Sequence, residues 1–84
     1  MKYNVYILSS TVTRKSYVGF TDNLDRRIKE HNSGDSYYTK RYAPWKVIYN
    51  EELNSQAEAR NREKYLKSAS GRRLVLKKIF NKII

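Results

Sequence analysis

Residues 3–20, YNVYILSSTVTRKSYVGF, decide the fold of this chain. The segments 3–8 (YNVYIL) and 16–20 (SYVGF) are rich in aromatic and β-branched residues, which predicts two strands. The residues between them are mostly hydroxyl-bearing or charged, as is typical of a hairpin connection. A turn centred on residues 11–12 would make Tyr6 and Tyr17 cross-strand neighbours. Side chains in such a pair lie close enough to act together, so two phenols would project from one spot on the sheet.

The composition indicates one small domain with a polyanionic partner. The chain has 84 residues and no cysteine, so neither disulfides nor a thiolate metal site support it. Its 18 Lys and Arg against 8 Asp and Glu give a net charge of +10, which favours binding to nucleic acid. A merely soluble basic protein, or one bound to an acidic partner, would have the same charge. No signal peptide or membrane-spanning run is evident, so a cytoplasmic protein is expected.

A helix is predicted after the second strand. Residues 21–23 (TDN) carry side chains that cap a helix, and Gly34 suits its left-handed end, which predicts a helix over about 23–32. Arg27 and His31 are four residues apart and lie on one side of this helix. Arg27 is either a solvated residue whose stem covers the core edge or a functional cation. His31 is either a packed, hydrogen-bonded histidine or part of a site. From the helix alone, the structural roles are favoured.

Residues 33–44 are polar, basic and rich in tyrosine. Aromatic rings interleaved with cations suit a groove that stacks bases and holds phosphates, and a surface loop with packed tyrosines is an equal alternative. A third strand is predicted over residues 45–49 (WKVIY), after Pro44. The aromatic and basic residues of the segment are Tyr37, Tyr38, Lys40, Arg41 and Tyr42.

Glu63 is the most informative position in the second half of the chain. Residues 55–58 (SQAE) form a capping box that begins a second helix, and Glu63 lies on its inward face. Over residues 60–84 it is the single acid among nine basic residues. An inward carboxylate is a hard oxygen ligand of the kind that divalent cations use. The commoner alternative is an ion pair with Lys67 or Arg60.

A third helix is predicted over residues 72–84, after a break at Ser70-Gly71. Its basic residues, Arg72 and Arg73 among them, lie largely away from the apolar positions and face either solvent or a nucleic-acid backbone. The apolar positions form a core-packing stripe of Leu76, Ile79, Phe80 and Ile83.

Taken together, these ordered elements resemble the GIY-YIG endonuclease superfamily. Its two half-motifs are similar to residues 4–6 (NVY) and 17–19 (YVG), and its glutamate segment is similar to residues 59–63 (ARNRE). The chain looks most like the small stand-alone branch related to the nuclease domain of the bacterial excision-repair incision subunit. Asn4 replaces the first glycine of the name motif, and Phe20 stands where those relatives tend to carry a lysine. The helix pattern of the family is matched by Leu24, Arg27 and His31.

The fold that the resemblance implies is α/β (α+β), in one domain over residues 1–84. A small, three-stranded, largely antiparallel sheet would be flanked by three helices. This agrees with the order of the elements predicted from the residues.

The resemblance also implies a metal-dependent endonuclease that hydrolyses phosphodiester bonds in DNA, in repair or recombination. Glu63 would hold Mg²⁺ or Mn²⁺, and Arg27 would neutralise charge on the phosphate. Tyr6 or Tyr17 would orient or deprotonate the attacking water, with Tyr6 slightly favoured and His31 assisting or positioning it. A phenol with a pKa of about 10 is a poor base at neutral pH, so the metal and Arg27 would have to lower that pKa.

The remaining expectations concern nucleic-acid binding. Because 84 residues leave no room for a separate recognition domain, specificity would come from a protein partner, from DNA shape, or be absent. A non-catalytic nucleic-acid-binding module with the same fold is the alternative, and a purely protein-binding role is the least favoured. Gly19 is expected to be structural. The expected nucleic-acid contacts are Lys40, Arg41, Lys67, Arg72 and Arg73.

Overall fold

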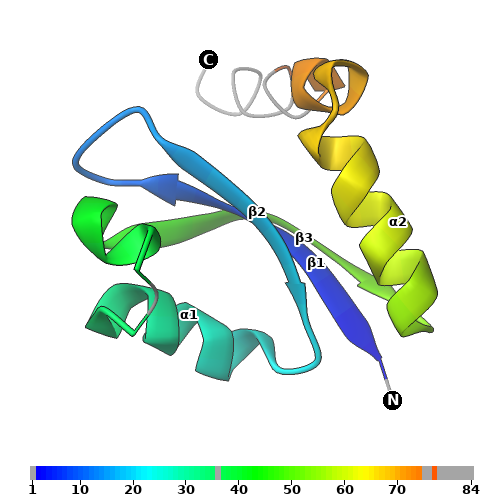
Figure 1. Ribbon diagram of the computed structural model, residues 1–84, viewed down its shortest axis with the longest axis horizontal. Coiled ribbons are helices and arrows are strands. Elements are labelled where there is room, and N and C mark those ends of the chain that lie inside the picture. Colours follow the sequence, from blue (N-terminus) through cyan, green and yellow to red (C-terminus); the bar gives the residue numbers. More distant parts are fainter. Residues whose placement is uncertain (1, 36, 75–76, 78–84) are drawn as a thin grey trace.

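The computed structural model describes residues 2–35, 37–74 and 77. The strands are β1 (Tyr3–Ser10), β2 (Ser16–Thr21) and β3 (Trp45–Leu53), and the helices are α1 (Leu24–Ser33), α2 (Gln56–Lys67) and the short 3₁₀ helix η1 (Thr39–Tyr42). The sheet has the order β2-β1-β3, and both pairs of strands are antiparallel. Figure 1 shows α1 and α2 on opposite sides of this sheet. The predicted three-stranded antiparallel α+β fold is therefore confirmed.

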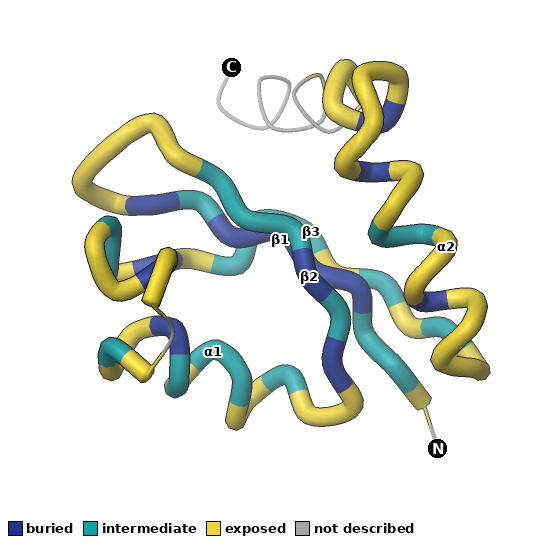
Figure 2. The backbone as a smooth tube through the Cα atoms, viewed as in Figure 1, coloured by how far each residue is buried: buried dark blue, intermediate teal, exposed yellow. Residues whose placement is uncertain are grey.

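The central strand β1 is buried on both faces. Val5 and Ile7 pack against α2, whereas Tyr6 and Leu8 pack with Trp45 and with apolar residues of α1 on the other face. Figure 2 shows this buried strand between the two helices, whose outer surfaces are exposed. A strand covered on both faces is apolar along its length rather than alternating, which explains the run of apolar residues in β1.

The predicted ends of the first helix are confirmed to within one residue. Asn23 caps α1, because its Oδ1 accepts a hydrogen bond of 3.1 Å from the backbone N–H of Arg26. Gly34 ends the helix in the left-handed conformation, with a φ of 93°. Beyond the helix end, the backbone N–H of Trp45 donates a 2.6 Å hydrogen bond to Oδ1 of Asn32. These contacts fix α1 against the start of β3.

The predicted capping box begins α2. Ser55 Oγ accepts a hydrogen bond of 3.2 Å from the backbone N–H of Glu58. The Glu58 carboxylate reaches back to the backbone N–H of Asn54 at 3.1 Å, one residue before the cap. An ion pair between Arg62 and Glu51 joins α2 to β3. The strand β3 extends to Leu53, beyond its predicted end at residue 49.

The register of the β1–β2 hairpin differs from the prediction. Tyr6 pairs with Gly19, and Tyr17 pairs with Leu8. The turn lies one residue later than expected, because Ser10 Oγ accepts hydrogen bonds of 3.2 and 3.1 Å from the backbone N–H groups of residues 12–13. The prediction that the two tyrosines face each other directly is wrong: they are diagonal neighbours on one face.

The break after α2 comes at Ser68, two residues before the predicted position, and residues 69–74 are helical. Gly71 is buried there, and a Cβ at this position would collide with the backbone of Tyr65 and Leu66. Glycine thus allows the second helical segment to approach the end of α2.

No helix in the described residues is long and apolar enough to cross a membrane. The predicted stripe of the last helix, Leu76, Ile79, Phe80 and Ile83, lies outside the described residues.

Candidate active site

A buried chain of hydrogen bonds forms the centre of the site. Tyr6 Oη lies 3.0 Å from Nε2 of His31, and Nδ1 of His31 lies 2.8 Å from Oγ1 of Thr39. His31 and Thr39 are fully buried. The carbonyl of Thr39 accepts a 2.6 Å hydrogen bond from Nε1 of Trp45. Thr39 was not predicted as part of the site, since a threonine in a polar segment eight residues after a histidine belongs to no recognisable motif.

His31 is neutral at pH 7. Burial, and then the charge of Arg27, lower the pKa of His31 to about 4. A neutral imidazole has one N–H donor and one acceptor nitrogen, and the hydroxyl groups of Tyr6 and Thr39 can each take the complementary role. Both hydrogen bonds are therefore satisfied with either tautomer, and the ring holds Tyr6 in place without carrying a charge.

Tyr6 keeps its proton at neutral pH. Burial and then the neighbouring Tyr17 raise the pKa of Tyr6 to about 12, although Arg27 acts in the opposite direction. Arg27 therefore lowers the pKa of this phenol, as expected. Burial raises the pKa by more, because β1 is covered on both faces.

Gly19 makes room for the two phenols. A Cβ at this position would lie 2.7 Å from Oη of Tyr6 and 2.9 Å from Cε1 of Tyr17. The ring centroids of Tyr6 and Tyr17 are 6.3 Å apart, and the Tyr17 ring is 4.8 Å from His31. Long side chains in diagonal positions of an antiparallel pair still touch. The two tyrosines consequently meet over Gly19 in spite of the shifted register.

Arg27 faces the two phenols from α1. Burial lowers the pKa of Arg27, but the charges and hydrogen bonds of Tyr6 and Tyr17 raise it on balance. Its side chain is 29% exposed and makes a long contact of 3.5 Å with Glu30. The side chain of the preceding Arg26 is 61% exposed and pairs with acidic residues of its own surface. Arg27 is therefore the guanidinium that α1 directs into the site.

Glu63 lies on α2 with its side chain 19% exposed, and its Oε1 is 2.7 Å from Nζ of Lys67. This is the ion pair that the sequence left open as the alternative role. The Glu63 charge is the smallest of the influences that shift the pKa of Tyr6, which places the carboxylate within electrostatic reach of that phenol. Among the described residues there is no group of three or more acidic, histidine or cysteine side chains that could hold a metal. A single carboxylate completed by waters and phosphate oxygens is nevertheless a donor set that fits Mg²⁺ or Mn²⁺.

Comparison with known proteins shows the family of this chain. The family described as GIY-YIG catalytic domain matches residues 2–78. The chain belongs to the GIY-YIG family. A UPF0213 protein of Clostridium perfringens is 42% identical over 64 residues, which are 75% of this chain and 68% of that protein. A UPF0213 protein of Natronomonas pharaonis is 36% identical over 67 residues, 79% of this chain and 78% of the relative.

A solved structure confirms the fold. The solution NMR structure of a UPF0213 protein from Bacillus halodurans superimposes with a TM-score of 0.56 at 31% identity, over 92% of this chain and 84% of that one. A Structure-specific endonuclease subunit SLX1 homolog of Giardia intestinalis is 42% identical over 43 residues, 48% of this chain and 12% of that protein. The resemblance to small stand-alone GIY-YIG proteins is confirmed, and membership of the family implies a nuclease-type domain with a nucleic-acid substrate.

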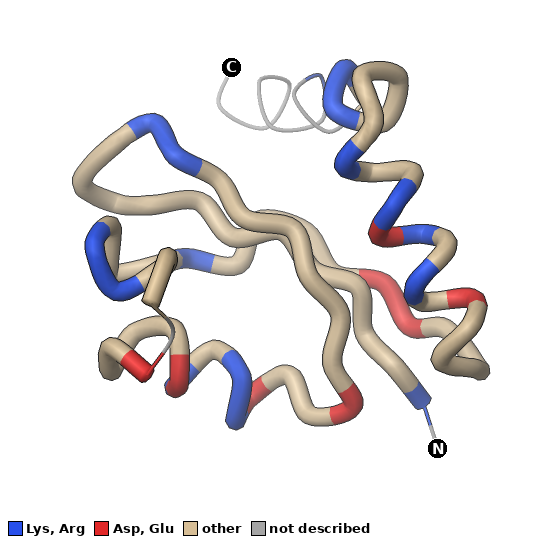
Figure 3. The backbone as a smooth tube through the Cα atoms, viewed as in Figure 1, with Lys and Arg blue, Asp and Glu red and all other residues tan. Residues whose placement is uncertain are grey.

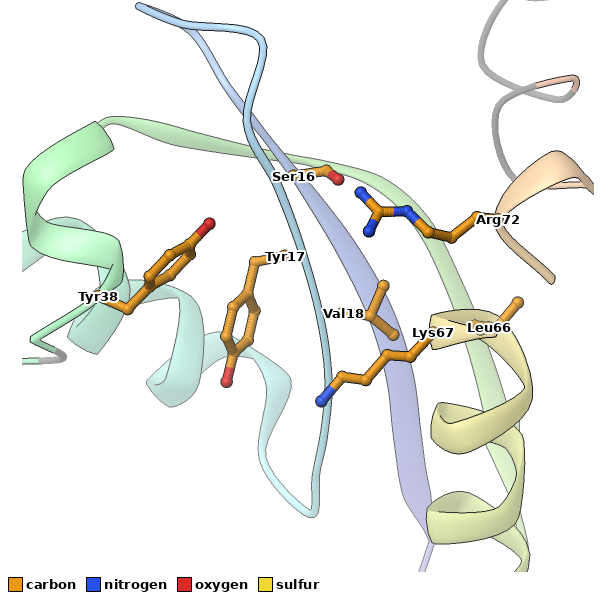
Figure 4. A pocket seen from close by; sticks show the side chains of 7 residues that line it. All are labelled: Ser16, Tyr17, Val18, Tyr38, Leu66, Lys67 and Arg72. Carbon is orange, nitrogen blue, oxygen red and sulfur yellow. The ribbon is translucent and has the colours of Figure 1, made fainter. Parts of the chain in front are cut away.

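An open cleft of about 430 Å³ adjoins the tyrosines of this GIY-YIG domain. Tyr17 and Tyr38 line one side of it, and Lys67 and Arg72 line the other (Figure 4). Figure 3 shows that basic residues follow α2 and also occur in η1 and the hairpin turn. Two of the predicted nucleic-acid contacts, Lys67 and Arg72, thus meet at the cleft. Three lie exposed outside its lining: Lys40, Arg41 and Arg73.

Proposed function

We propose that this GIY-YIG domain is a metal-dependent endonuclease that hydrolyses phosphodiester bonds in DNA. The observation that carries the proposal is the convergence of Tyr6, Tyr17 and Arg27 on the buried His31. Two phenols placed over a glycine, with a guanidinium against both, form a polar site that packing alone does not require. These are groups that bind a phosphate and orient a water.

Arg27 binds the scissile phosphate and neutralises the charge that develops on it. The two phenols raise the pKa of Arg27, so the guanidinium keeps its full positive charge where the phosphate would bind. Glu63 would hold Mg²⁺ or Mn²⁺, which would supply positive charge to polarise a phosphate oxygen and stabilise the leaving oxygen. To hold the metal, Glu63 would give up its ion pair with Lys67.

Tyr6 orients the attacking water. With a pKa of about 12 it holds no significant charge at pH 7, so its role does not rest on a stored phenolate. Its Oη accepts a hydrogen bond from that water while its own hydroxyl group donates to Nε2 of His31, 3.0 Å away. This arrangement uses the neutral tautomer in which Nδ1–H of His31 donates to Thr39. Tyr17 flanks the same phosphate.

The test is a cleavage assay with Mg²⁺ or Mn²⁺ on branched, nicked and single-stranded DNA, using Arg27→Ala and Arg26→Ala as a matched pair. Both variants remove one arginine from α1, and Arg26 lies outside the site. We expect Arg27→Ala to lower the rate by about 10²–10³-fold, the usual cost of losing one donor to a developing anion, while Arg26→Ala stays near the wild-type rate. Equal rates for the two variants would exclude Arg27 from catalysis.

The ion pair of Glu63 with Lys67 favours a second candidate, a non-catalytic nucleic-acid-binding module. In such a module the carboxylate needs no metal, because Lys67 already neutralises it. Salt-sensitive DNA binding without cleavage in either metal would select this function. For the endonuclease we propose a cytoplasmic role in repair or recombination, with specificity supplied by a protein partner or by DNA shape.

A further inference from the structure

The cleft beside the catalytic tyrosines combines aromatic and cationic walls. Tyr38 is 45% exposed, and its ring centroid is 6.2 Å from that of Tyr17. Val18 and Leu66 add apolar surface between the aromatic side and the basic side. At about 430 Å³ the cleft falls within the range of roughly 300–1,000 Å³ that is typical of ligand sites.

The cations of this cleft come from two helical segments. Lys67 is at the last turn of α2 and extends toward Tyr17, and Arg72 points toward Ser16 (Figure 4). The segment that carries Arg72 is fixed by a 2.9 Å hydrogen bond from the backbone N–H of Arg72 to the carbonyl of Ser68. Within the described residues, the Arg72 guanidinium has no acidic partner, so the cleft offers an uncompensated positive charge.

We propose that this cleft holds one unstacked nucleotide next to the bond that is cut, with its base against Tyr38 and its phosphate on Arg72 and Lys67. The assignment of that nucleotide to the cleaved strand rests on the proposed function. A nucleotide offers a flat π-face and an anion on one rigid unit, and these match the two walls of the cleft. An acidic peptide would use the cations and leave the aromatic wall without a partner.

The nucleotide pocket predicts a requirement for the substrate. A base paired within a duplex cannot reach Tyr38 without leaving its stack, so the pocket selects nucleic acid with an unpaired nucleotide beside the scissile phosphate. Tyr17 belongs to both the pocket and the catalytic cluster, which places the two sites side by side.

The first test compares Tyr38→Ala with Tyr37→Ala. Both variants lose a tyrosine from one short segment, but Tyr37 is 77% exposed, contacts Lys40 and does not line the cleft. The probe is a fluorescein-labelled thymidine oligonucleotide, and fluorescence anisotropy is measured in EDTA to prevent cleavage. We expect Tyr38→Ala to weaken binding about tenfold, the usual loss of one base–aromatic contact, and Tyr37→Ala to change it much less.

The base is identified with an oligonucleotide of the same length made of abasic units. Wild-type protein should bind this probe more weakly than the thymidine probe, and Tyr38→Ala should cause no further loss. An equal loss in Tyr38→Ala and Tyr37→Ala, or a Tyr38 effect that persists on the abasic probe, overturns the pocket.

The second test compares Arg72→Ala with Arg73→Ala. Each variant removes one positive charge, but only Arg72 lines the cleft. We expect Arg72→Ala to weaken oligonucleotide binding several-fold more than Arg73→Ala does. Arg72→Ala should also make the slope of log affinity against log salt concentration shallower, by the amount expected for the loss of about one phosphate contact. If the two variants bind the oligonucleotide alike, the helical residues 69–74 attract DNA only through their overall charge.

The outcomes separate this inference from the proposed function. If the matched pairs behave as expected but wild-type protein cuts nothing in Mg²⁺ or Mn²⁺, the nucleotide pocket stands and the endonuclease fails. If wild-type protein cuts DNA while the matched pairs bind alike, the endonuclease stands and the pocket fails.

Discussion

Gly19→Ala adds one methyl group where the two phenols of the site meet. At an ordinary strand position the change would stabilise the fold, because glycine costs roughly 0.5–1 kcal/mol relative to alanine there. In this protein the new Cβ would lie 2.7 Å from Oη of Tyr6 and 2.9 Å from both Cζ of Tyr6 and Cε1 of Tyr17. Unstrained contacts between carbon atoms are about 3.5–4.0 Å, so at least one ring must move.

Tyr6 has little freedom to move. It is 1% exposed and bonded through Oη to His31, so a shift of its ring breaks a buried hydrogen bond. Overpacking costs about 1–3 kcal/mol, and the lost hydrogen bond adds roughly 1 kcal/mol. After subtraction of the roughly 0.5–1 kcal/mol that alanine gains over glycine in a strand, we expect the free energy of unfolding to fall by about 1–3.5 kcal/mol, a large share of the 5–15 kcal/mol that is typical of small domains.

Urea denaturation followed by the fluorescence of Trp45 measures this loss. Gly34→Ala is the control: its φ of 93° makes alanine strained by about 1–2 kcal/mol, while the nearest side-chain atom is an ordinary 3.7 Å away and the phenols are not touched. NMR signals of the His31 ring should shift in Gly19→Ala and stay in place in Gly34→Ala. In a Tyr6→Phe background the cost of Gly19→Ala should shrink, since the closest contact is gone. A Gly19→Ala protein as stable as wild type, with unchanged His31 signals, would refute the steric argument.

Three further predictions concern pH, metal and salt. Stability should fall by roughly 3 kcal/mol as the pH drops from above 6.5 to below 4, because unfolded His31 takes up a proton at its ordinary pKa of 6.5 and the folded one only at a pKa of about 4. Urea midpoints at several pH values should show this component in wild type and not in His31→Asn. Glu63→Gln should abolish both metal-dependent cleavage and metal-induced NMR shifts. The same variant should change the free energy of unfolding by less than about 1 kcal/mol, since its ion-pair partner Lys67 is half exposed. A fully active variant would remove Glu63 from the site. DNA affinity should fall steeply as the salt concentration rises: the slope of log affinity against log salt concentration should be about −0.9 for each phosphate contact. An affinity that moderate salt leaves unchanged would contradict electrostatic binding.

Local signals in the sequence predicted the elements well. Asn23, Gly34 and Ser55 satisfy backbone groups of their own helices, so their roles depend on neighbours within a few residues. The hairpin register was missed because its turn is set by the Ser10 hydroxyl, whose carbonyl partner, that of Tyr42, is remote in sequence. A single hydroxyl in a run of similar residues gives no sequence signal of that choice.

The candidate site was predicted in part. Tyr6, Arg27, His31 and Glu63 were selected through a family resemblance, and the structure brings the first three together. The membership of Thr39 in the site could not be predicted, since it depends on how η1 packs on α1. Tyr38 was named among the rings that suit a base-stacking groove, but its position beside Tyr17 depends on the same packing. The same holds for the pKa of Tyr6, because the covering of β1 by α1 and α2 determines its burial.

The sequence by itself determined the three strand segments, the helices α1 and α2 with their starts, and the strongly basic charge. These properties follow from backbone preferences, capping side chains and charge, which act over a few residues or simply add up. The tertiary structure decided the register that sets Tyr6 over Gly19, the neutral state of His31 and the cleft with two cations on one wall. Each of these depends on groups far apart in the chain, because desolvation and close contact exist only after the segments have packed together.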